Sequence, residues 1–259
     1  MARFAPQFNL YKIIDKLSAL CDLIFWSVFA LSVVPALFKV FTIKFDISTY
    51  ADILNIICIV LFFILDTIID HVLIPLAEAK RNDDFVDNSF NSQFSLQNSD
   101  GYFDNDEVKH GLYKAAVNMF ENSFFTYSLL KRNTVNKTVV PALTFTIILV
   151  SAYFGFQHVP FALSLLQILF STNLLGALIK HLILVNKLSV IFDDWMKLFQ
   201  LTDFDSSATK YDSYIFRNWL RYETLIAKIP AKIPAKIFDK YNPILTQDWV
   251  SLKQKLNIK

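Results

Sequence analysis

The stretch Ile53–Pro75, ILNIICIVLFFILDTIIDHVLIP, decides the fold class, because it is almost entirely apolar and its three acidic or basic side chains lie near its end. A helix of about 20 apolar residues is long enough to cross the hydrocarbon core of a bilayer. Three further runs have the same character, at about Leu17–Phe41, Thr138–Gln157 and Pro160–Val185. The sequence therefore predicts four transmembrane helices, arranged as two hairpins.

The composition points the same way. Hydrophobic residues make up 54% of the chain and charged residues 19%, against about 45–50% and about 25% in soluble domains. These values exclude intrinsic disorder, a collagen-like chain and a disulfide scaffold. The alternative is a soluble all-α protein with buried helices, but such helices are rarely this long and this apolar in four copies.

The distribution of Lys and Arg predicts the orientation. Segments 1–16, 76–137 and 186–259 hold three, seven and twelve of these residues. The turn between the first two spans holds only Lys39 and Lys44, and the turn between the last two holds none. Because cytoplasmic segments carry the excess of Lys and Arg, we expect both termini and the long central segment to be cytoplasmic.

The predicted fold is therefore an all-α integral membrane protein with a helical cytoplasmic domain. In chain order its parts are a cytoplasmic N-terminal segment at 1–16, transmembrane hairpin 1 at 17–75, a cytoplasmic insertion at 76–137, transmembrane hairpin 2 at 138–185 and a basic, aromatic cytoplasmic tail at 186–259.

The insertion predicts a loop followed by a helix. Span two is expected to continue past the bilayer through Lys80 and Arg81, and residues 88–106 have the Asn, Ser and Asp content of a loop. A helix is expected from about Glu107, ending at Lys131-Arg132, since basic residues suit a helix C-terminus.

The tail predicts two amphipathic helices, NKLSVIFDDWMKLFQL from Asn186 and SYIFRNWLRYETLIAKI from Ser213. The repeat AKIPAKIPAKIF from Ala227 to Phe238 is expected to be an extended basic strap, because its two prolines forbid a regular helix. A short last helix is expected to start near Thr246.

Polar side chains inside the spans are candidate functional residues, because they are costly in lipid. They are Asp66, Asp70 and His71 in span two, and Asn173, Lys180 and His181 in span four. Asp70 and Lys180 reach a similar depth, so the two aspartates are expected to pair with Lys180, within or between subunits, or to line a wet pore mouth. A purely structural pair or snorkelling near the interface is the alternative.

The basic residues of the tail are candidates for binding an anion. Arg217 and Arg221 are one helical turn apart and could clamp one phosphate. The full candidate set is Arg217, Arg221, Lys228, Lys232, Lys236, Lys80 and Arg81. Basic groups interleaved with aromatic rings bind anionic lipid, nucleotides or single-stranded nucleic acid, and the alternative is an ordinary excess of positive charge on the cytoplasmic side.

Enzyme motifs are missing from the sequence, which contains no Walker loop, GxGxxG, GxSxG, HExxH or CxxC. The acidic clusters Asp83–Asp87 and Asp104–Glu107 do not have a calcium-loop spacing, and the four histidines lack metal-ligand spacing. We therefore predict a protein that is not an enzyme, with no catalytic residue, metal or cofactor.

One part of the chain carries a family resemblance. It comprises KRNDDFVDNSF at Lys80–Phe90, GYFDN at Gly101–Asn105 and the helix Lys114–Phe125. It resembles bacterial multi-span membrane effectors of antiphage defence, with the membrane effector of Hailong-type defence as the nearest case. The resemblance implies a tetrameric ion channel in the inner (cytoplasmic) membrane, gated by short DNA oligomers from a partner nucleotidyltransferase.

Four spans are too few to build a wide pore alone, so the expected protein is a homo-oligomer around a closed symmetry axis. The leading hypothesis is a ligand-gated, pore-forming effector whose cytoplasmic part senses a nucleotide or oligonucleotide. The alternative is a non-conducting anchor or scaffold that recruits a cytoplasmic partner, and a membrane enzyme acting on lipid is the third hypothesis.

Overall fold

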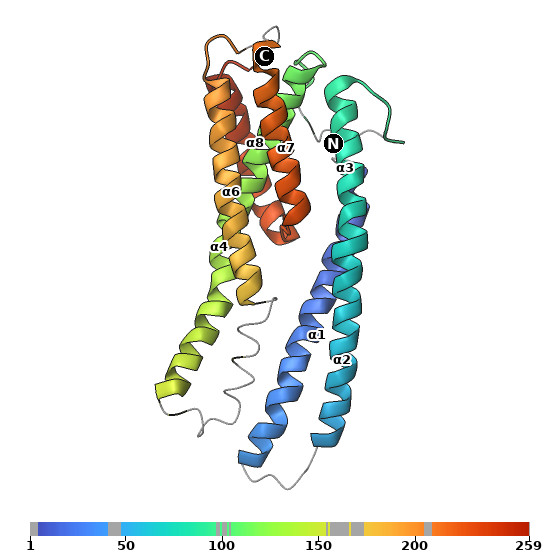
Figure 1. Cartoon of the computed structure of the whole chain (residues 1–259), viewed down its shortest axis with the longest axis vertical. Coiled ribbons are helices and arrows are strands. Elements are labelled where there is room, and N and C mark those ends of the chain that lie inside the picture. The colour runs from blue at the N-terminus through green and yellow to red at the C-terminus, as the bar shows by residue number, and fades with distance from the viewer. Residues whose placement is uncertain are drawn as a thin grey trace. The chain divides into compact units, whose positions relative to one another are not determined.

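The computed structural model describes residues 5–40, 48–96, 99, 103, 105–153, 155, 166, 174–204 and 209–258. Every regular element in these ranges is a helix (Figure 1). In chain order they are α1 (Phe8–Val40), α2 (Ser48–Ile68), the π-helix η1 (Ile69–Leu73), α3 (Ile74–Phe90), α4 (Leu112–Tyr153), α6 (Leu175–Phe199), the 3₁₀ turn η3 (Thr209–Tyr211), α7 (Asp212–Lys228) and α8 (Ala235–Lys255).

Within the described residues, four helical stretches are long and apolar enough to cross a membrane, as the sequence predicted. They are Phe8–Pro35, Thr49–Phe90, Leu112–Tyr153 and Leu175–Phe199. The second and third have 42 residues each, about twice what a bilayer needs. Much of the expected fourth span, at 160–165 and 167–173, lies outside the described residues.

The chain divides into two compact units. One comprises residues Met1–Lys12, Ile74–Asn133 and His181–Lys259, and we call it the body. The other comprises Ile13–Leu73 and Thr134–Lys180, and we call it the apolar unit. The sequence had predicted changes of character at 75/76, 137/138 and 185/186.

In the apolar unit, α1 and α2 form an antiparallel pair (Figure 1). The Asn55 amide donates to the Ser32 hydroxyl at 3.0 Å, and the Phe25 and Phe62 rings lie 6.2 Å apart. Most of the large apolar side chains of α2 remain exposed on this pair. The exposed surface is therefore the kind that lipid or another protein chain must cover.

The body is built around the first half of α4. All ten residues from Lys114 to Ser123 are buried, so this helix is enclosed on every side. Its Phe120 ring lies 5.1 Å from the Phe199 ring of α6 and 5.2 Å from the Trp249 ring of α8. Figure 1 shows α4, α6, α7 and α8 side by side around this core.

The structure corrects the expected end of the central helix. The helix begins at Leu112 and does not end at Lys131-Arg132, because α4 continues without a break to Tyr153. The residues that follow Arg132, NTVNK, contain no glycine or proline that would stop a helix. One helix therefore runs from the core of the body into the apolar unit.

The structure also corrects the expected strap and last helix. The extended part is limited to 229–234, and α8 begins at Ala235 instead of near Thr246. Pro234 stands at the N-cap position of α8, where a missing backbone N–H removes no helical hydrogen bond. The second proline of the repeat thus starts a helix.

Candidate functional site

Helix α7 carries a group of charged and aromatic contacts at its centre. It is amphipathic, and its buried face consists of Ile215, Asn218, Tyr222 and Ile226 at helical spacing. Arg221 and Glu223 flank Tyr222 and therefore project to either side of that face. The three successive residues Arg221, Tyr222 and Glu223 contact three different helices.

Glu223 binds Arg81 of α3. The Arg81 Nη2 atom donates to Glu223 Oε2 at 2.7 Å, and its Nε atom donates to Glu78 Oε2 at 2.7 Å. Arg81 is only 7% exposed. Two carboxylates thus share one buried guanidinium, and breaking such a buried group by removing one partner leaves an uncompensated charge.

Tyr222 links these charged residues to α4 and packs its ring near the Arg81 guanidinium. Its hydroxyl lies 3.0 Å from the Thr126 hydroxyl, and its ring lies 5.9 Å from the Arg81 guanidinium. Burial raises the pKa of the Glu223 carboxyl, and the Arg81 charge opposes that rise. Burial also raises the pKa of the Tyr222 phenol.

Two further contacts extend the group to the remaining long helices. The Tyr11 hydroxyl of α1 donates to Glu78, and Arg221 Nη1 donates to Asp194 Oδ2 of α6. We call this set the α7 hub: Tyr11, Glu78, Arg81, Thr126, Asp194, Arg221, Tyr222 and Glu223. Through it, α7 bonds α3, α4 and α6 directly and reaches α1 through Glu78.

The hub includes two of the residues that the sequence predicted as anion ligands. Arg81 and Arg221 are held by carboxylates. The other candidates are exposed, namely Arg217, Lys80, Lys228, Lys232 and Lys236. Arg217 lies on the outer face of α7, one turn from Arg221.

The polar residues that the sequence placed inside the predicted spans differ in their burial. Asp66 and Asp70 are half-buried, and Asp70 and His71 lie in the π-helix η1, a distortion that often marks functional positions. Lys180 is exposed, and no ion pair within the described residues includes it. Asn173 lies outside the described residues.

The first acidic cluster organises the end of α3. The Asp87 carboxylate accepts the N–H groups of Phe94 and Ser95 at 2.8 and 2.7 Å, and Asp84 accepts the Ser99 N–H at 2.8 Å. Burial alone would raise the pKa of Asp87, but these hydrogen bonds lower it. Burial raises the pKa of Asp84. The two carboxylates thus hold the chain that follows α3.

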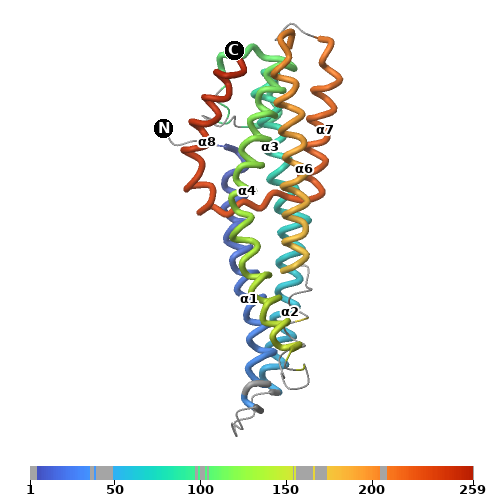
Figure 2. The backbone as a smooth tube through the Cα atoms, turned by 90° about the vertical axis from the view of Figure 1, so that its left-hand side faces the viewer, coloured from blue at the N-terminus to red at the C-terminus, as the bar shows by residue number. Residues whose placement is uncertain are grey.

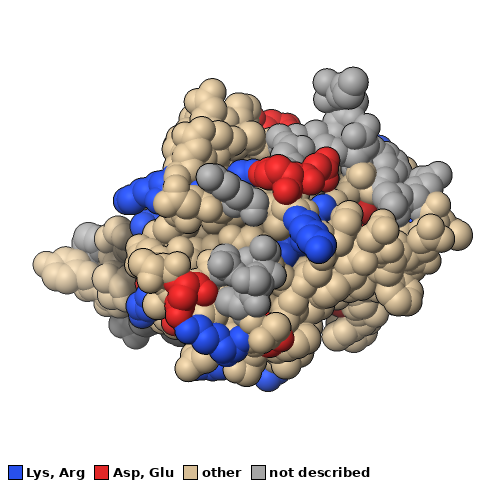
Figure 3. Space-filling model, turned by 90° about the horizontal axis from the view of Figure 1, so that it is seen from above, with Lys and Arg blue, Asp and Glu red and all other residues tan. Residues whose placement is uncertain are grey.

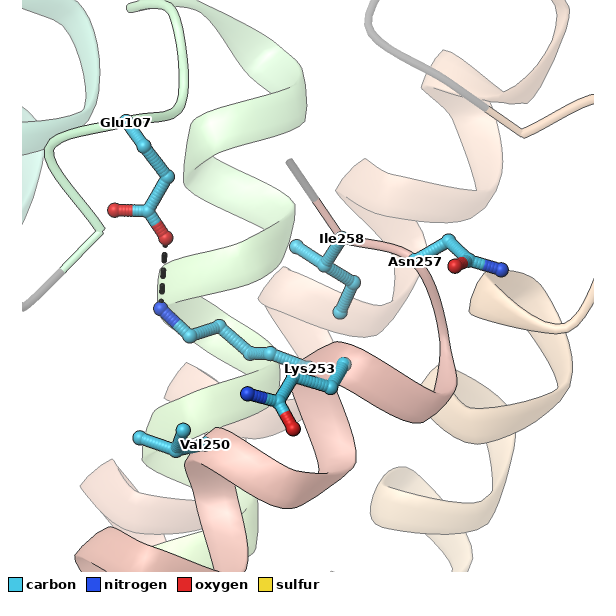
Figure 4. Close-up of a pocket in the computed structure, with 6 residues that line it drawn as sticks. Glu107, Val250, Lys253, Asn257 and Ile258 are labelled. Carbon is cyan, nitrogen blue, oxygen red and sulfur yellow. Dashed lines mark hydrogen bonds and ion pairs between the residues drawn. The ribbon is translucent and has the colours of Figure 1, made fainter.

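A shallow pocket of about 420 Å³ lies at the end of α8 and is shown in Figure 4. Its lining includes Lys253, whose amine points at the Glu107 carboxylate and donates to it at 2.8 Å. Burial would raise the pKa of Glu107, but the Lys253 bond lowers it. The paired charges cancel, so this pocket is a poor candidate for binding an anion.

Behind that pocket lies a buried polar network. The Asn105 amide donates to Asn118 Oδ1 at 2.8 Å and to Glu121 Oε2 at 2.7 Å, and its oxygen accepts from Lys253 at 3.0 Å. Asn118 in turn donates to Asn88 at 2.8 Å. The network joins α3, α4 and α8, and its bonds are those of a structural core.

The surface charge of the body is mixed where it can be seen end-on. On the face in Figure 3, Lys and Arg side chains lie beside Asp and Glu side chains. In the described part of the chain, no group of three or more His, Cys, Asp or Glu side chains is placed to hold a metal ion.

Sequence reasoning did not find the hub. Glu78, Asp194 and Glu223 have the appearance of solvated charges on helix surfaces, and only the Glu78–Arg81 spacing of three residues was a local signal. Arg221-Tyr222-Glu223 within an amphipathic helix was a second one, since a buried tyrosine brings its charged neighbours to the edge of the core.

Comparison with known proteins does not assign a family. No protein-family model matches the chain, and neither the curated proteins nor the solved structures contain a match.

Proposed function

We propose that the protein is a homo-oligomeric, ligand-gated, pore-forming membrane effector whose body is cytoplasmic. The observation that carries the proposal is the α7 hub. Three successive residues of one helix bond α3, α4 and α6, and Glu78 extends the connection to α1. A displacement of α7 therefore acts on all four of the helices that are long and apolar enough to cross a membrane.

The ligand is proposed to be anionic, of the nucleotide or oligonucleotide class. Arg217 is exposed on α7 one turn from Arg221, so an anion bound there lies close to the Arg221–Asp194 pair and competes with Asp194 for positive charge. The resemblance of residues 80–125 to Hailong-type membrane effectors supports the same class, with a tetramer gated by DNA oligomers as its most specific form and antiphage defence as its setting.

The decisive experiment measures ion flux through purified full-length protein in liposomes. Short single-stranded DNA oligomers and cyclic nucleotides are added in turn, and Arg217→Gln is compared with Lys255→Gln, an exposed lysine in the last turn of α8. We expect flux that responds to one of these anions, a response lost in Arg217→Gln and retained in Lys255→Gln.

Two results would contradict this proposal. The first is an oligomer, confirmed by its mass, that conducts under none of these conditions, which would instead favour the anchor or scaffold function. The second is ligand-responsive flux that is identical in the two variants, which would remove Arg217 from the site.

A further inference from the structure

A row of four lysines borders the segment between α7 and α8. Lys228, Lys232, Lys236 and Lys240 recur at every fourth position of AKIPAKIPAKIFDK, residues 227–240, and all four are exposed. We call them the lysine row. Figure 2 shows the chain between α7 and α8 running across the direction of the helices.

The apolar residues between the lysines fix this segment to the body. Ile229, Ala231 and Ile233 pack against the hydrophobic core of the body. The two prolines at 230 and 234 restrict the backbone further. The segment is therefore held from its inner side, and its lysines are directed outward.

Three lysines of the row have no acidic partner among the residues that the structure describes. Within the described residues, Lys228, Lys236 and Lys240 form no ion pair, and Lys240 instead lies 5.0 Å from the Tyr241 ring. By contrast, Arg81 and Arg221 are matched with carboxylates.

The far end of the row lies where α4 leaves the body. The Tyr241 ring is 4.7 Å from the Arg132 guanidinium, and Arg132 precedes Thr138, where the apolar run of α4 begins, by six residues. Six residues of helix span about 9 Å. Lys131 and Lys137 add positive charge to the same stretch of α4.

We propose that the lysine row binds the anionic headgroups of the membrane leaflet that faces the body. This proposal rests on the proposed membrane insertion of the four apolar helices. Basic residues next to a spanning helix are attracted to anionic lipid within a Debye length. Phe238, which is partly exposed beside Lys236 and Lys240, supplies an aromatic ring of the kind found at membrane interfaces.

The test uses the full-length protein in nanodiscs of phosphatidylcholine alone or of phosphatidylcholine mixed with phosphatidylglycerol. The acetylation rate of each lysine is measured by mass spectrometry. We expect phosphatidylglycerol to slow acetylation of the row about fivefold per lysine, and about 1 M salt to abolish the effect. Lys109 and Lys255, exposed elsewhere in the body, serve as internal controls whose rates should not change.

A variant with all four row lysines changed to Gln sharpens the result. We expect phosphatidylglycerol to raise the melting temperature of the unmodified protein. The variant should enter the discs as the unmodified protein does, but its melting temperature should be the same in both lipid compositions. Lys109→Gln/Lys255→Gln is the matched control and should keep that rise.

The outcomes separate the two proposals. A chain that fails to enter discs of either composition contradicts the proposed membrane function itself. A chain that enters but shows equal acetylation rates in both discs overturns the lipid contact alone. Protection of the row by single-stranded DNA and not by phosphatidylglycerol also overturns it, since the row would then bind a soluble polyanion.

Discussion

The two halves of α4 have the same backbone and opposite surroundings. From Leu112 to Asn133 the helix belongs to the body, and from Thr134 to Tyr153 it belongs to the apolar unit. The first half is enclosed by other helices, whereas the second leaves large apolar side chains exposed. A helix that is apolar on most of its surface belongs in a protein core or in a membrane. Among the described residues, the second half contributes Ile148 to a small cluster with Leu174, Phe29 and Leu166.

The polar side chains of the two halves differ in the same way. In the body, Asn118 bonds to Asn88 and Thr126 to Tyr222, on other helices, whereas the Ser123 hydroxyl donates to the Met119 carbonyl of the same helix. In the second half, the hydroxyls of Thr144, Thr146 and Ser151 donate to the carbonyl four residues earlier in the same helix. A helix in lipid must satisfy its polar groups internally, and these three hydroxyls do so, so we expect two different solvents for the two halves of one helix.

The substitution with the largest expected effect tests how far the stability of the body depends on polar contacts between helices. Arg81→Met leaves Glu78 and Glu223 without their buried partner, and we expect it to lower the free energy of unfolding by about 3–5 kcal/mol. Denaturant unfolding in detergent, followed by tryptophan fluorescence, measures the change. Arg217→Met, at an exposed position of α7, is the control and should change little. Equal stability of the two variants would contradict a stabilising role for the hub.

The second prediction makes the same substitution in each half of α4. Leu130 is 1% exposed and Leu143 is 60% exposed. We expect Leu130→Ala to lower the free energy of unfolding by about 2–5 kcal/mol, because it leaves a cavity, and Leu143→Ala to cost below about 1 kcal/mol. Unfolding in detergent again reports both values. A larger loss at Leu143 would show that protein packs around the second half.

The third prediction concerns insertion. Phe145 in the second half and Tyr214 in the body are both about half exposed, at 50% and 54%. We expect Phe145→Lys to reduce membrane insertion, since a lysine at the centre of a spanning helix costs about 2.5–3.5 kcal/mol, and Tyr214→Lys to leave insertion unchanged. A glycosylation reporter in microsomes measures the inserted fraction. Similar insertion of both variants would count against a lipid-facing second half.

The smallest effect depends on pH. The pKa of Asp87 is lowered by its hydrogen bonds, so the ionised form stabilises the fold above its unfolded pKa of about 3.9. Asp87→Asn should cost about 1–3 kcal/mol at neutral pH. The difference from the unmodified protein should shrink as the pH falls through the lowered pKa. Thermal melts across acidic pH test this, with the exposed Asp83→Asn as control; a loss that does not vary with pH would contradict it.

The sequence was informative where one physical effect dominates. The apolar run at Ile53–Pro75 predicted a spanning helix because burial of apolar surface in lipid outweighs other terms over that length. The continuity of α4 was missed because Lys131-Arg132 resembles a helix end, although residues 133–137 directly beyond it contain no glycine or proline, and α4 continues through Pro141. The start of α8 was missed because proline both excludes and begins helices, depending on its position.

The hub shows what local patterns could not supply. Arg81 was considered an anion ligand because it is basic and near the membrane. Its partner Glu78 is three residues away, but its other partner, Glu223, lies 142 residues from Arg81 along the chain. Pairing over that separation is decided by helix packing, which no local spacing encodes.

The most direct test of the central claim places nitroxide spin labels at single positions along α4 of the reconstituted full-length protein. Relaxation by oxygen, which concentrates in lipid, is compared with relaxation by a water-soluble nickel chelate. We expect labels at Val139, Leu143 and Val150 to be relaxed by oxygen and not by nickel, and labels at Met119 and Leu130 to be relaxed by neither. Strong nickel relaxation at the first three positions would show that the second half lies in water, and would contradict the two-solvent description of α4.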